Sequence, residues 1–283
     1  MNKQFIKTIA LVTLLTFGVA LGGYAFTSGY SSFAELAAAE DPSSYNVKTS
    51  VVGSNTTILA IHGGGIERGT SELVQALGRT GKYNTYSFEG LKANDNGSLF
   101  IKAINFDEPK AVSLVNQSNY TVTVIGAAGD DEVTYVGGQN KLLAELVRLH
   151  LTTKGYNVKT LGIADRIAGV MDSNIVNKNK LFNGNYELGG VQIAISNGLR
   201  DKLVSDSGSL NNYSGAIDQA LSQSWPTMTK LMNKVSKNNN YNGFMNRFNP
   251  EKKNFDKKVN KALEKGANNP TELIENVKEV TEE

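Results

Sequence analysis

The 283-residue chain contains no cysteine, and this absence removes several kinds of chemistry at once. Without thiols there are no disulfides, no thiolate metal site and no cysteine nucleophile. A lipoprotein anchor is excluded as well, because its attachment residue is a cysteine. Histidine is scarce too, since only His62 and His150 occur. Any imidazole ligand or base must be one of these two.

A strong excess of charge is also lacking. Lys and Arg together number 29, against 27 for Asp and Glu. This near balance gives no reason to expect a nucleic-acid partner or an acidic surface. The length and the ordinary apolar content allow one or two domains with a substantial core.

The first residues have the pattern of a secretory signal. Lys3 and Lys7 precede an uncharged apolar run from Thr8 to about Phe26, and small residues near its end offer cleavage points. We expect residues 1–28 to form a signal peptide or, if uncut, an N-terminal membrane anchor. The protein would then be secreted or membrane-anchored with an extracytoplasmic body, and only this segment would contact the membrane.

The middle of the chain, residues 29–225, alternates short β-branched runs with longer helical patterns, which predicts an α/β sheet domain. Strands are expected over Thr56–His62, Tyr120–Ile125, Val158–Ile163 and Gly190–Ser196, and helices over Ser71–Leu77 and Lys141–Leu151. In the last strand, Gln192, Ala194 and Ser196 share one face.

After residue 225 the composition shifts to Lys and Asn, with few β-branched residues. A basic amphipathic stretch runs from Glu251 to Lys265, and a helix start is expected at Pro270. We interpret residues 226–283 as a helical or partly disordered tail, either a solvated extension or an arm that binds a partner. The body is expected to fold without it.

A glycine-rich loop, His62-Gly63-Gly64-Gly65-Ile66-Glu67, follows the first expected strand. Open α/β sheets collect ligands at such strand ends. A histidine and a carboxylate released there can converge on one zinc ion, and the glycines let the backbone approach a substrate. A purely structural role for the single histidine also fits this spacing.

Further motifs follow in order: Gly69-Thr70-Ser71-Glu72, Tyr86-Ser87-Phe88-Glu89-Gly90, Asn105-Phe106-Asp107-Glu108-Pro109, Tyr135-Val136-Gly137-Gly138, Asn174-Ile175-Val176-Asn177, Gly190-Val191-Gln192 and Gly198-Leu199-Arg200. Together they make the stretch from Tyr30 to Arg200 resemble the poly-γ-glutamate hydrolase family of phages and bacilli. The resemblance implies an α/β fold with a zinc-carboxypeptidase-like mixed sheet, to which this chain adds a C-terminal helical extension. It also implies cleavage of γ-glutamyl amide bonds by a zinc ion held by two histidines and a glutamate.

The resemblance places substitutions at several positions of the family's site. His62 and Glu67 match the first two zinc ligands. The third ligand corresponds to Ile125, the glutamate expected as general base to Ala194, and a further family histidine to Phe100. Because isoleucine offers zinc no lone pair and alanine accepts no proton, we expect weak or absent zinc and impaired or lost hydrolysis.

Other residues can take up these roles. Asp130, Asp131 and Glu132 follow the lost ligand closely and can supply an oxygen, so an active zinc γ-glutamyl hydrolase with an unconventional third ligand remains an alternative. His150 falls in the last turn of an expected helix, and we interpret it as a surface or helix-end residue. A third hypothesis is a membrane-tethered interaction protein that uses the fold as a scaffold.

A γ-glutamyl polymer or peptide is polyanionic and needs cations to pair with its carboxylates. Lys178 and Arg200 are the candidate cations, although either can be an ordinary surface charge, and Gln192 is a candidate polar contact. Capping or loop-stabilising roles are assigned to the acidic residues of the motifs, Glu72, Glu89, Asp107 and Glu108.

Overall fold

The computed structural model describes residues 29–160, 165–179, 188–236 and 250–282. The expected signal or anchor at residues 1–28 lies outside the described residues, as do residues 161–163 of an expected strand. In the part of the chain that is described, no helix is both long enough and apolar enough to cross a membrane.

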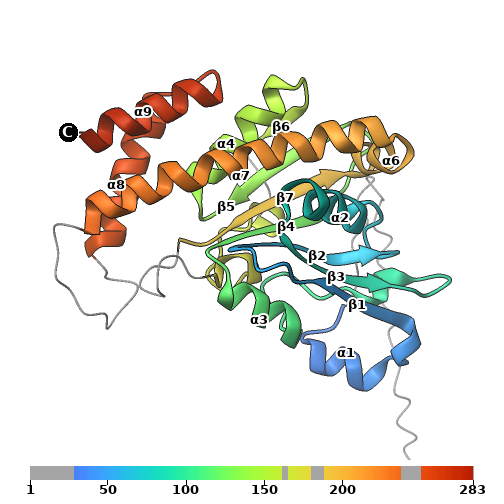
Figure 1. Ribbon diagram of the computed structural model, residues 1–283. Helices are drawn as coiled ribbons and strands as arrows, with labels where there is room; N and C mark the ends of the chain where they lie inside the picture. The colour runs from blue at the N-terminus through green and yellow to red at the C-terminus, as the bar shows by residue number, and fades with distance from the viewer. Residues whose placement is uncertain (1–28, 161–164, 180–187, 237–249, 283) are drawn as a thin grey trace, which may run out of the picture.

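A seven-stranded mixed sheet runs through the molecule in the order β1-β3-β2-β4-β7-β5-β6 (Figure 1). The strands are β1 (Tyr45–Ser50), β2 (Thr56–Gly64), β3 (Asn84–Gly90), β4 (Tyr120–Ala127), β5 (Val133–Gly138), β6 (Asn157–Lys159) and β7 (Val191–Ser196). β1 is antiparallel to β3 and β5 is antiparallel to β7, while the other neighbours are parallel. The parallel strands β2, β4 and β7 are buried on both faces, which explains their apolar and β-branched sequences.

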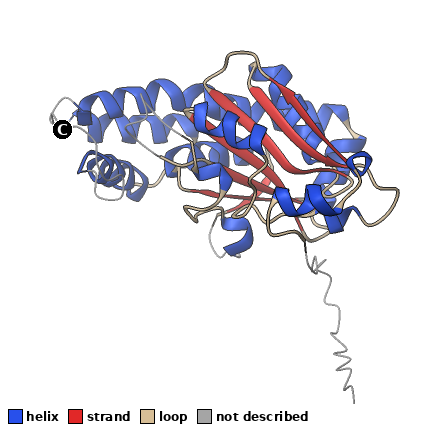
Figure 2. Cartoon of the chain, turned by 90° about the horizontal axis from the view of Figure 1, so that it is seen from below, coloured by secondary structure: helices blue, strands red, loops and turns tan. Residues whose placement is uncertain are grey.

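Helices cover both faces of the sheet (Figures 1 and 2). One face is covered by α2 (Thr70–Gly81), α4 (Lys141–Thr153), α6 (Asn197–Ser205) and α7 (Ser207–Ser236). On the other side lie α1 (Phe33–Ala39), α3 (Pro109–Gln117), α5 (Asp165–Ala168) and the 3-10 turns η1 (Pro42–Ser44), η2 (Asn96–Leu99) and η3 (Ile175–Asn177). The helix expected to stop before Gly155 does so, and that glycine has φ 85°, a backbone conformation that suits glycine.

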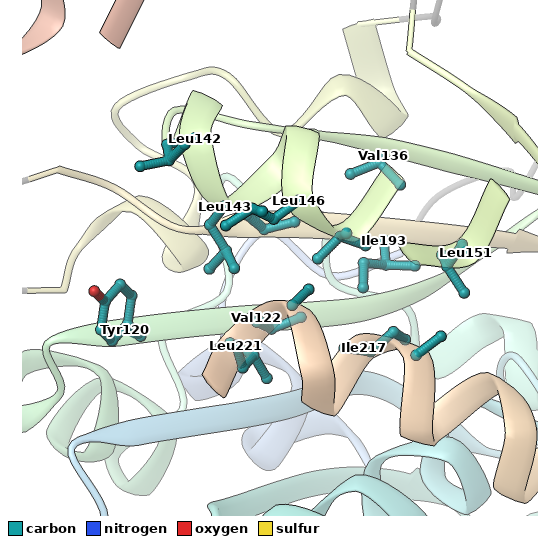
Figure 3. Packing of buried hydrophobic residues seen from close by; sticks show 14 of the residues in the cluster. Tyr120, Val122, Val136, Leu142, Leu143, Leu146, Leu151, Ile193, Ile217 and Leu221 are labelled. Carbon is teal, nitrogen blue, oxygen red and sulfur yellow. The ribbon is translucent and has the colours of Figure 1, made fainter. Parts of the chain in front are cut away.

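The face under α2, α4, α6 and α7 holds the larger core, here called the helix-side core. Figure 3 shows Val122 on β4 and Ile193 on β7 packed between Leu146 of α4 and Ile217 of α7. These side chains alternate along the strands with residues that point to the opposite face. The helix-side core therefore stabilises one face of the sheet, and the candidate site lies on the other face.

The opposite face carries a second buried cluster, here called the site-side core. It contains Ile61 of β2, Ile125 of β4 and Ala194 of β7, together with Phe100 and Phe106 from the connections on that side. The face that the sequence assigned to the catalytic groups is thus apolar around Ile125 and Ala194.

The C-terminal helices join the helix-side core. α7 continues through the expected boundary at residue 225, and α8 (Pro250–Glu264) and α9 (Pro270–Glu282) pack against α4 and α7. Their buried apolar side chains include Phe255, Val259, Leu273 and Val277. The described part of the expected tail is therefore helical and packed rather than a solvated extension. That residues 226–283 form a separate domain stays a prediction.

Candidate functional site

His62 and Glu67 lie where the sequence predicted, at the C-terminal end of β2 and in the loop before α2. The pairing of β2 with β3 shifts register between Ala60 and Gly63, so His62 lies at an irregularity near the end of the strand. Gly64 has φ 59° and a Cβ there would lie 2.6 Å from the Gly90 carbonyl oxygen, so the loop requires glycine. The Glu67 amide donates to the His62 carbonyl at 2.8 Å and closes the loop.

Both ring nitrogens of His62 are engaged. Nε2 lies 2.8 Å from the Ile101 carbonyl oxygen, which can only accept, so Nε2 carries a proton. Nδ1 lies 2.9 Å from Oε2 of Glu67. The Phe100 ring stacks on the imidazole, with 4.1 Å between the ring centroids and 28° between the planes. His62 is therefore fixed in orientation and covered by an aromatic ring.

Glu67 is held from a second direction. Its Oε2 also accepts the Gly126 amide of β4 at 2.6 Å. A Cβ at position 126 would lie 2.9 Å from Cδ of Glu67, so glycine there permits the close approach. The exposed fraction is 2% for the His62 side chain and 4% for that of Glu67. This is a buried pair in which both imidazole nitrogens and Oε2 of Glu67 have protein partners.

Ile125 and Ala194 are the residues that the family resemblance assigned to the third-ligand and base positions. They are partners in the parallel ladder between β4 and β7. Ile125 is 3% exposed and Ala194 is fully buried, and both belong to the site-side core. Neither side chain has an atom that can bind a metal or accept a proton.

The donor set does not fit a catalytic zinc ion. Such an ion takes three protein ligands and a water. Only His62 and Glu67 converge here, and among the described residues no group of three His, Cys, Asp or Glu side chains is placed to hold a metal. The Ile101 carbonyl still fixes the ring orientation that turns Nδ1 toward Glu67, an arrangement typical of a ligating histidine. The third donor is what the site lacks.

Gln192 lies on the predicted face of β7 but is fully buried in a polar network. Its Nε2 donates to the Ile167 carbonyl at 3.0 Å, and its Oε1 accepts from Nδ2 of Asn174 at 3.0 Å. The side-chain amide of Gln192 therefore holds α5 and the N-terminal end of η3 against the sheet.

Arg200 lies next to the pair, at the start of α6. Its guanidinium donates to the carbonyls of Ile195 at 3.2 Å and Arg68 at 2.7 Å, and it also binds the Asn197 side chain. Burial lowers the pKa of Arg200, and the nearby Glu67 carboxylate partly opposes this shift. Arg200 therefore lies near Glu67, but several of its N–H groups already donate to backbone carbonyls.

Lys178 is placed elsewhere. It directly follows Asn177, whose Oδ1 accepts the Gly190 amide just before β7, and Asn179 binds the Asn119 carbonyl just before β4. Lys178 is therefore at the N-terminal ends of these strands, opposite the edge that carries His62. Its ammonium forms no hydrogen bond or ion pair with another described residue. As a polymer contact it stays a prediction.

The residues considered as replacement ligands lie away from the pair. Asp130, Asp131 and Glu132 are exposed, and Glu132 forms an ion pair with Lys202 at 2.6 Å. His150 is in the last turn of α4 as predicted, but it is buried against α7, where its Nε2 binds Oε1 of Gln223 at 2.9 Å. The prediction of a surface position for His150 was wrong because α7 covers that face of α4.

The acidic residues of the motifs have structural partners. Glu72 accepts the Gly69 amide and Glu108 accepts the Ala111 amide, so each caps a helix. Asp107 accepts the Phe33 amide at 2.6 Å, and Glu89 pairs with Lys48 at 2.7 Å.

Sequence reasoning missed the Ile101 carbonyl and the Gly126 amide, because backbone groups leave no mark in the residue types. The contacts of Gln192 with Asn174 and Ile167 were missed for a similar reason, since they depend on how the loops fold back.

Comparison with known proteins identifies relatives of this chain. The sequence model of the family described as Poly-gamma-glutamate hydrolase matches residues 30–222. The UPF0714 protein YndL of Bacillus subtilis is 36% identical over 204 residues, which are 71% of this chain and 78% of YndL. The SPbeta prophage-derived UPF0714 protein YoqZ of Bacillus subtilis is 41% identical over 150 residues, 53% of this chain and 54% of YoqZ.

Solved structures agree as well. A bacteriophage poly-gamma-glutamate hydrolase superposes with a TM-score of 0.64 at 27% identity, covering 71% of this chain and 99% of that one. A zinc-free apo structure of YndL gives a TM-score of 0.64 at 34% identity, covering 69% and 98%. The predicted mixed-sheet, zinc-peptidase-like fold is thereby confirmed, and the match extends past Arg200 into α7. The chain belongs to the poly-gamma-glutamate hydrolase family.

Proposed function

We propose that this family member does not hydrolyse γ-glutamyl bonds and instead binds a γ-glutamyl polymer or peptide. The observation that carries the proposal is the apolar pair Ile125 and Ala194, buried side by side where the family has a zinc ligand and a base. Loss of a general base alone lowers the rate roughly a hundredfold to ten-thousandfold. Loss of a ligand as well leaves no firmly held metal to activate water.

Binding without cleavage is supported by the cations at the rim of the same site. Arg200 lies beside Glu67, and Arg68 is exposed at the end of the glycine loop, where it faces Asp201 at 3.3 Å. Both guanidinium groups can pair with carboxylates, and Arg200 keeps a fixed geometry through its backbone contacts. Such binding is expected to weaken as salt rises, because exposed charges are screened.

Export is part of the proposal. Lys3, Lys7 and the apolar run to Phe26 support secretion or, if uncut, anchoring of an extracytoplasmic body. An uncut anchor would favour the membrane-tethered interaction protein. A fusion of residues 1–40 to a reporter, followed by fractionation, tests export, and a reporter that stays in the cytoplasm contradicts it.

The alternative of an active zinc hydrolase draws on one observation, the orientation of the His62 ring that turns Nδ1 toward Glu67. It requires a third donor that the described residues do not bring to the pair in this arrangement. An exposed acid from positions 130–132 would have to move inward to supply it.

The deciding experiment combines metal analysis with a cleavage assay on one purified protein, residues 29–283. We expect substoichiometric zinc after dialysis against a mild chelator and no shortening of poly-γ-glutamate with zinc supplied. Titration calorimetry with the polymer should show binding that weakens in high salt and in Arg200→Ala. Zinc-dependent cleavage that disappears in His62→Ala would reject the proposal and establish the alternative.

A further inference from the structure

We infer that the His62–Glu67 pair is a metal-free structural crosslink and that the former zinc centre has become part of the stabilising core. The inference rests on the proposed loss of the metal. It concerns folding stability, so its tests measure unfolding and not cleavage.

The pair joins segments that are distant in sequence. His62 belongs to β2, and Glu67 precedes α2. Ile101, which accepts from Nε2 at 2.8 Å, lies in the connection between η2 and α3, and Gly126, which donates to Glu67 at 2.6 Å, lies in β4. Ile101 also bridges to Tyr30 at the start of the described chain. A bound metal would tie the same region together, and here hydrogen bonds do so.

Both ring nitrogens of His62 and one carboxylate oxygen of Glu67 are bound by protein groups. Oε2 of Glu67 accepts from the Gly126 amide and lies 2.9 Å from Nδ1 of His62, and each ring nitrogen of His62 has a partner. With side chains only 2% and 4% exposed, water cannot replace a partner that is removed. Removing one member of a buried pair leaves an uncompensated polar or charged group, which is strongly destabilising.

Apolar side chains surround the His62–Glu67 pair and suit a centre without a metal ion. Phe100 stacks on the imidazole, and Ile125 and Ala194 fill the adjoining ladder positions of the site-side core. In the metal-free protein, histidine at 125 or glutamate at 194 would place a polar group among apolar side chains. The substitutions therefore stabilise a centre that lacks an ion, whereas the family residues would need one.

The first test is thermal unfolding of the natural protein with chelator and with added zinc. We expect the same unfolding midpoint in both, and this arm needs no substitution that could prevent folding. A midpoint that falls with chelator or rises with zinc would overturn the inference, because the pair would then be acting as a metal site.

The second test removes the pair. His62→Ala and Glu67→Ala should each lower the midpoint by roughly 10 °C, and the double variant should lose less than the sum of the two. Glu67→Gln, which keeps the shape, serves if Glu67→Ala does not fold. The matched control is Glu132→Ala, which breaks the exposed pair with Lys202 and should change little. Single variants as stable as the control would refute the crosslink while leaving the proposed loss of hydrolysis intact.

The third test restores the family residues. Ile125→His with Ala194→Glu should lower the midpoint in metal-free buffer, and zinc should raise it again by binding the folded state. A double variant that matches the natural protein without metal would contradict the inference.

Discussion

Ile125 on β4 lies opposite Ala194 on β7, one residue before the Gly126 amide that binds Glu67. The ligand position and the base position are therefore neighbours across one rung of the ladder. Groups placed there would act on the same water molecule, since a base must reach the water that the metal holds. If the two residues replace a ligand and a base, they remove one functional unit, so we expect hydrolysis to depend on both positions together.

The first prediction is that hydrolysis returns only when both groups return. Ile125→His and Ala194→Glu should each stay near background in a chain-shortening assay with zinc supplied. The combined variant, with or without Phe100→His, should exceed either single variant by roughly a hundredfold or more, because metal and base act together. Adding His62→Ala to the combined variant is the control and should abolish the gain. A single variant as active as the combined variant would show that hydrolysis does not need both groups.

Much of the fold could be predicted from the sequence. β2, β4 and β7 are continuous apolar or β-branched runs because both of their faces are buried, and α4 has a clear helical period with a glycine stop. β1 and β3 were not predicted as strands. Their sequences, Tyr45–Ser50 and Asn84–Gly90, mix polar and aromatic residues, and they become strands by pairing with each other and, for β3, with β2.

The site was predictable as residue types but not as contacts. The motif order pointed to His62 and Glu67, which lie together, and its interpretation of Ile125 and Ala194 as substitutions stays a prediction. Lys178 was predicted as a substrate contact although it lies at the opposite strand ends, because position along the chain does not reveal which edge a loop reaches. The packing of α8 and α9 was hidden for a related reason, since their many Lys and Asn residues mask a narrow apolar stripe that includes Phe255.

The second prediction concerns the C-terminal helices. A chain cut after Gln223 should still unfold cooperatively, because the phage hydrolase is matched over 99% of its length by only 71% of this chain. Its unfolding midpoint should nevertheless be lower, since the cut removes buried side chains such as Phe255 and Val277 and exposes their partners. Thermal unfolding of the two chains measures this. An unchanged midpoint would mean that the packed helices add no stability, and loss of cooperative unfolding would mean that the body needs them.

A single substitution in the full chain also tests whether the packing of the C-terminal helices adds stability. Phe255→Ala should destabilise by about 3 to 5 kcal/mol, as large-to-small changes in a core do. Denaturant titration measures the change, with the exposed Lys257→Ala on the same helix as the control. A Phe255 effect no larger than that control would show that α8 packs only loosely.

The third prediction is a pH dependence at Glu40. Lys92 and the Tyr30 hydroxyl donate to its carboxylate at 2.7 and 2.8 Å, and these bonds hold the pKa of Glu40 below its ordinary value of 4.5. A lowered pKa in the folded state adds stability that is complete above the unfolded value and is lost as pH falls through the folded value. Glu40→Gln should thus lower the midpoint at pH 7 by a few degrees, and the difference should shrink as pH drops below 4.5. A difference that is constant with pH would exclude this contribution.

The last prediction separates a structural role from a binding role at Gln192, which the sequence offered as a substrate contact. Its amide binds Asn174 and the Ile167 carbonyl inside the protein. Gln192→Leu keeps the volume but leaves both partners buried and unpaired, which costs about 1 to 3 kcal/mol. We therefore expect a lower unfolding midpoint with unchanged affinity for poly-γ-glutamate in calorimetry below that midpoint. Gln117→Leu is the matched control, because that glutamine is exposed and binds only Ser113. If Gln192→Leu instead weakened polymer binding with no loss of stability, the buried network would be open to the ligand and Gln192 would regain its predicted role.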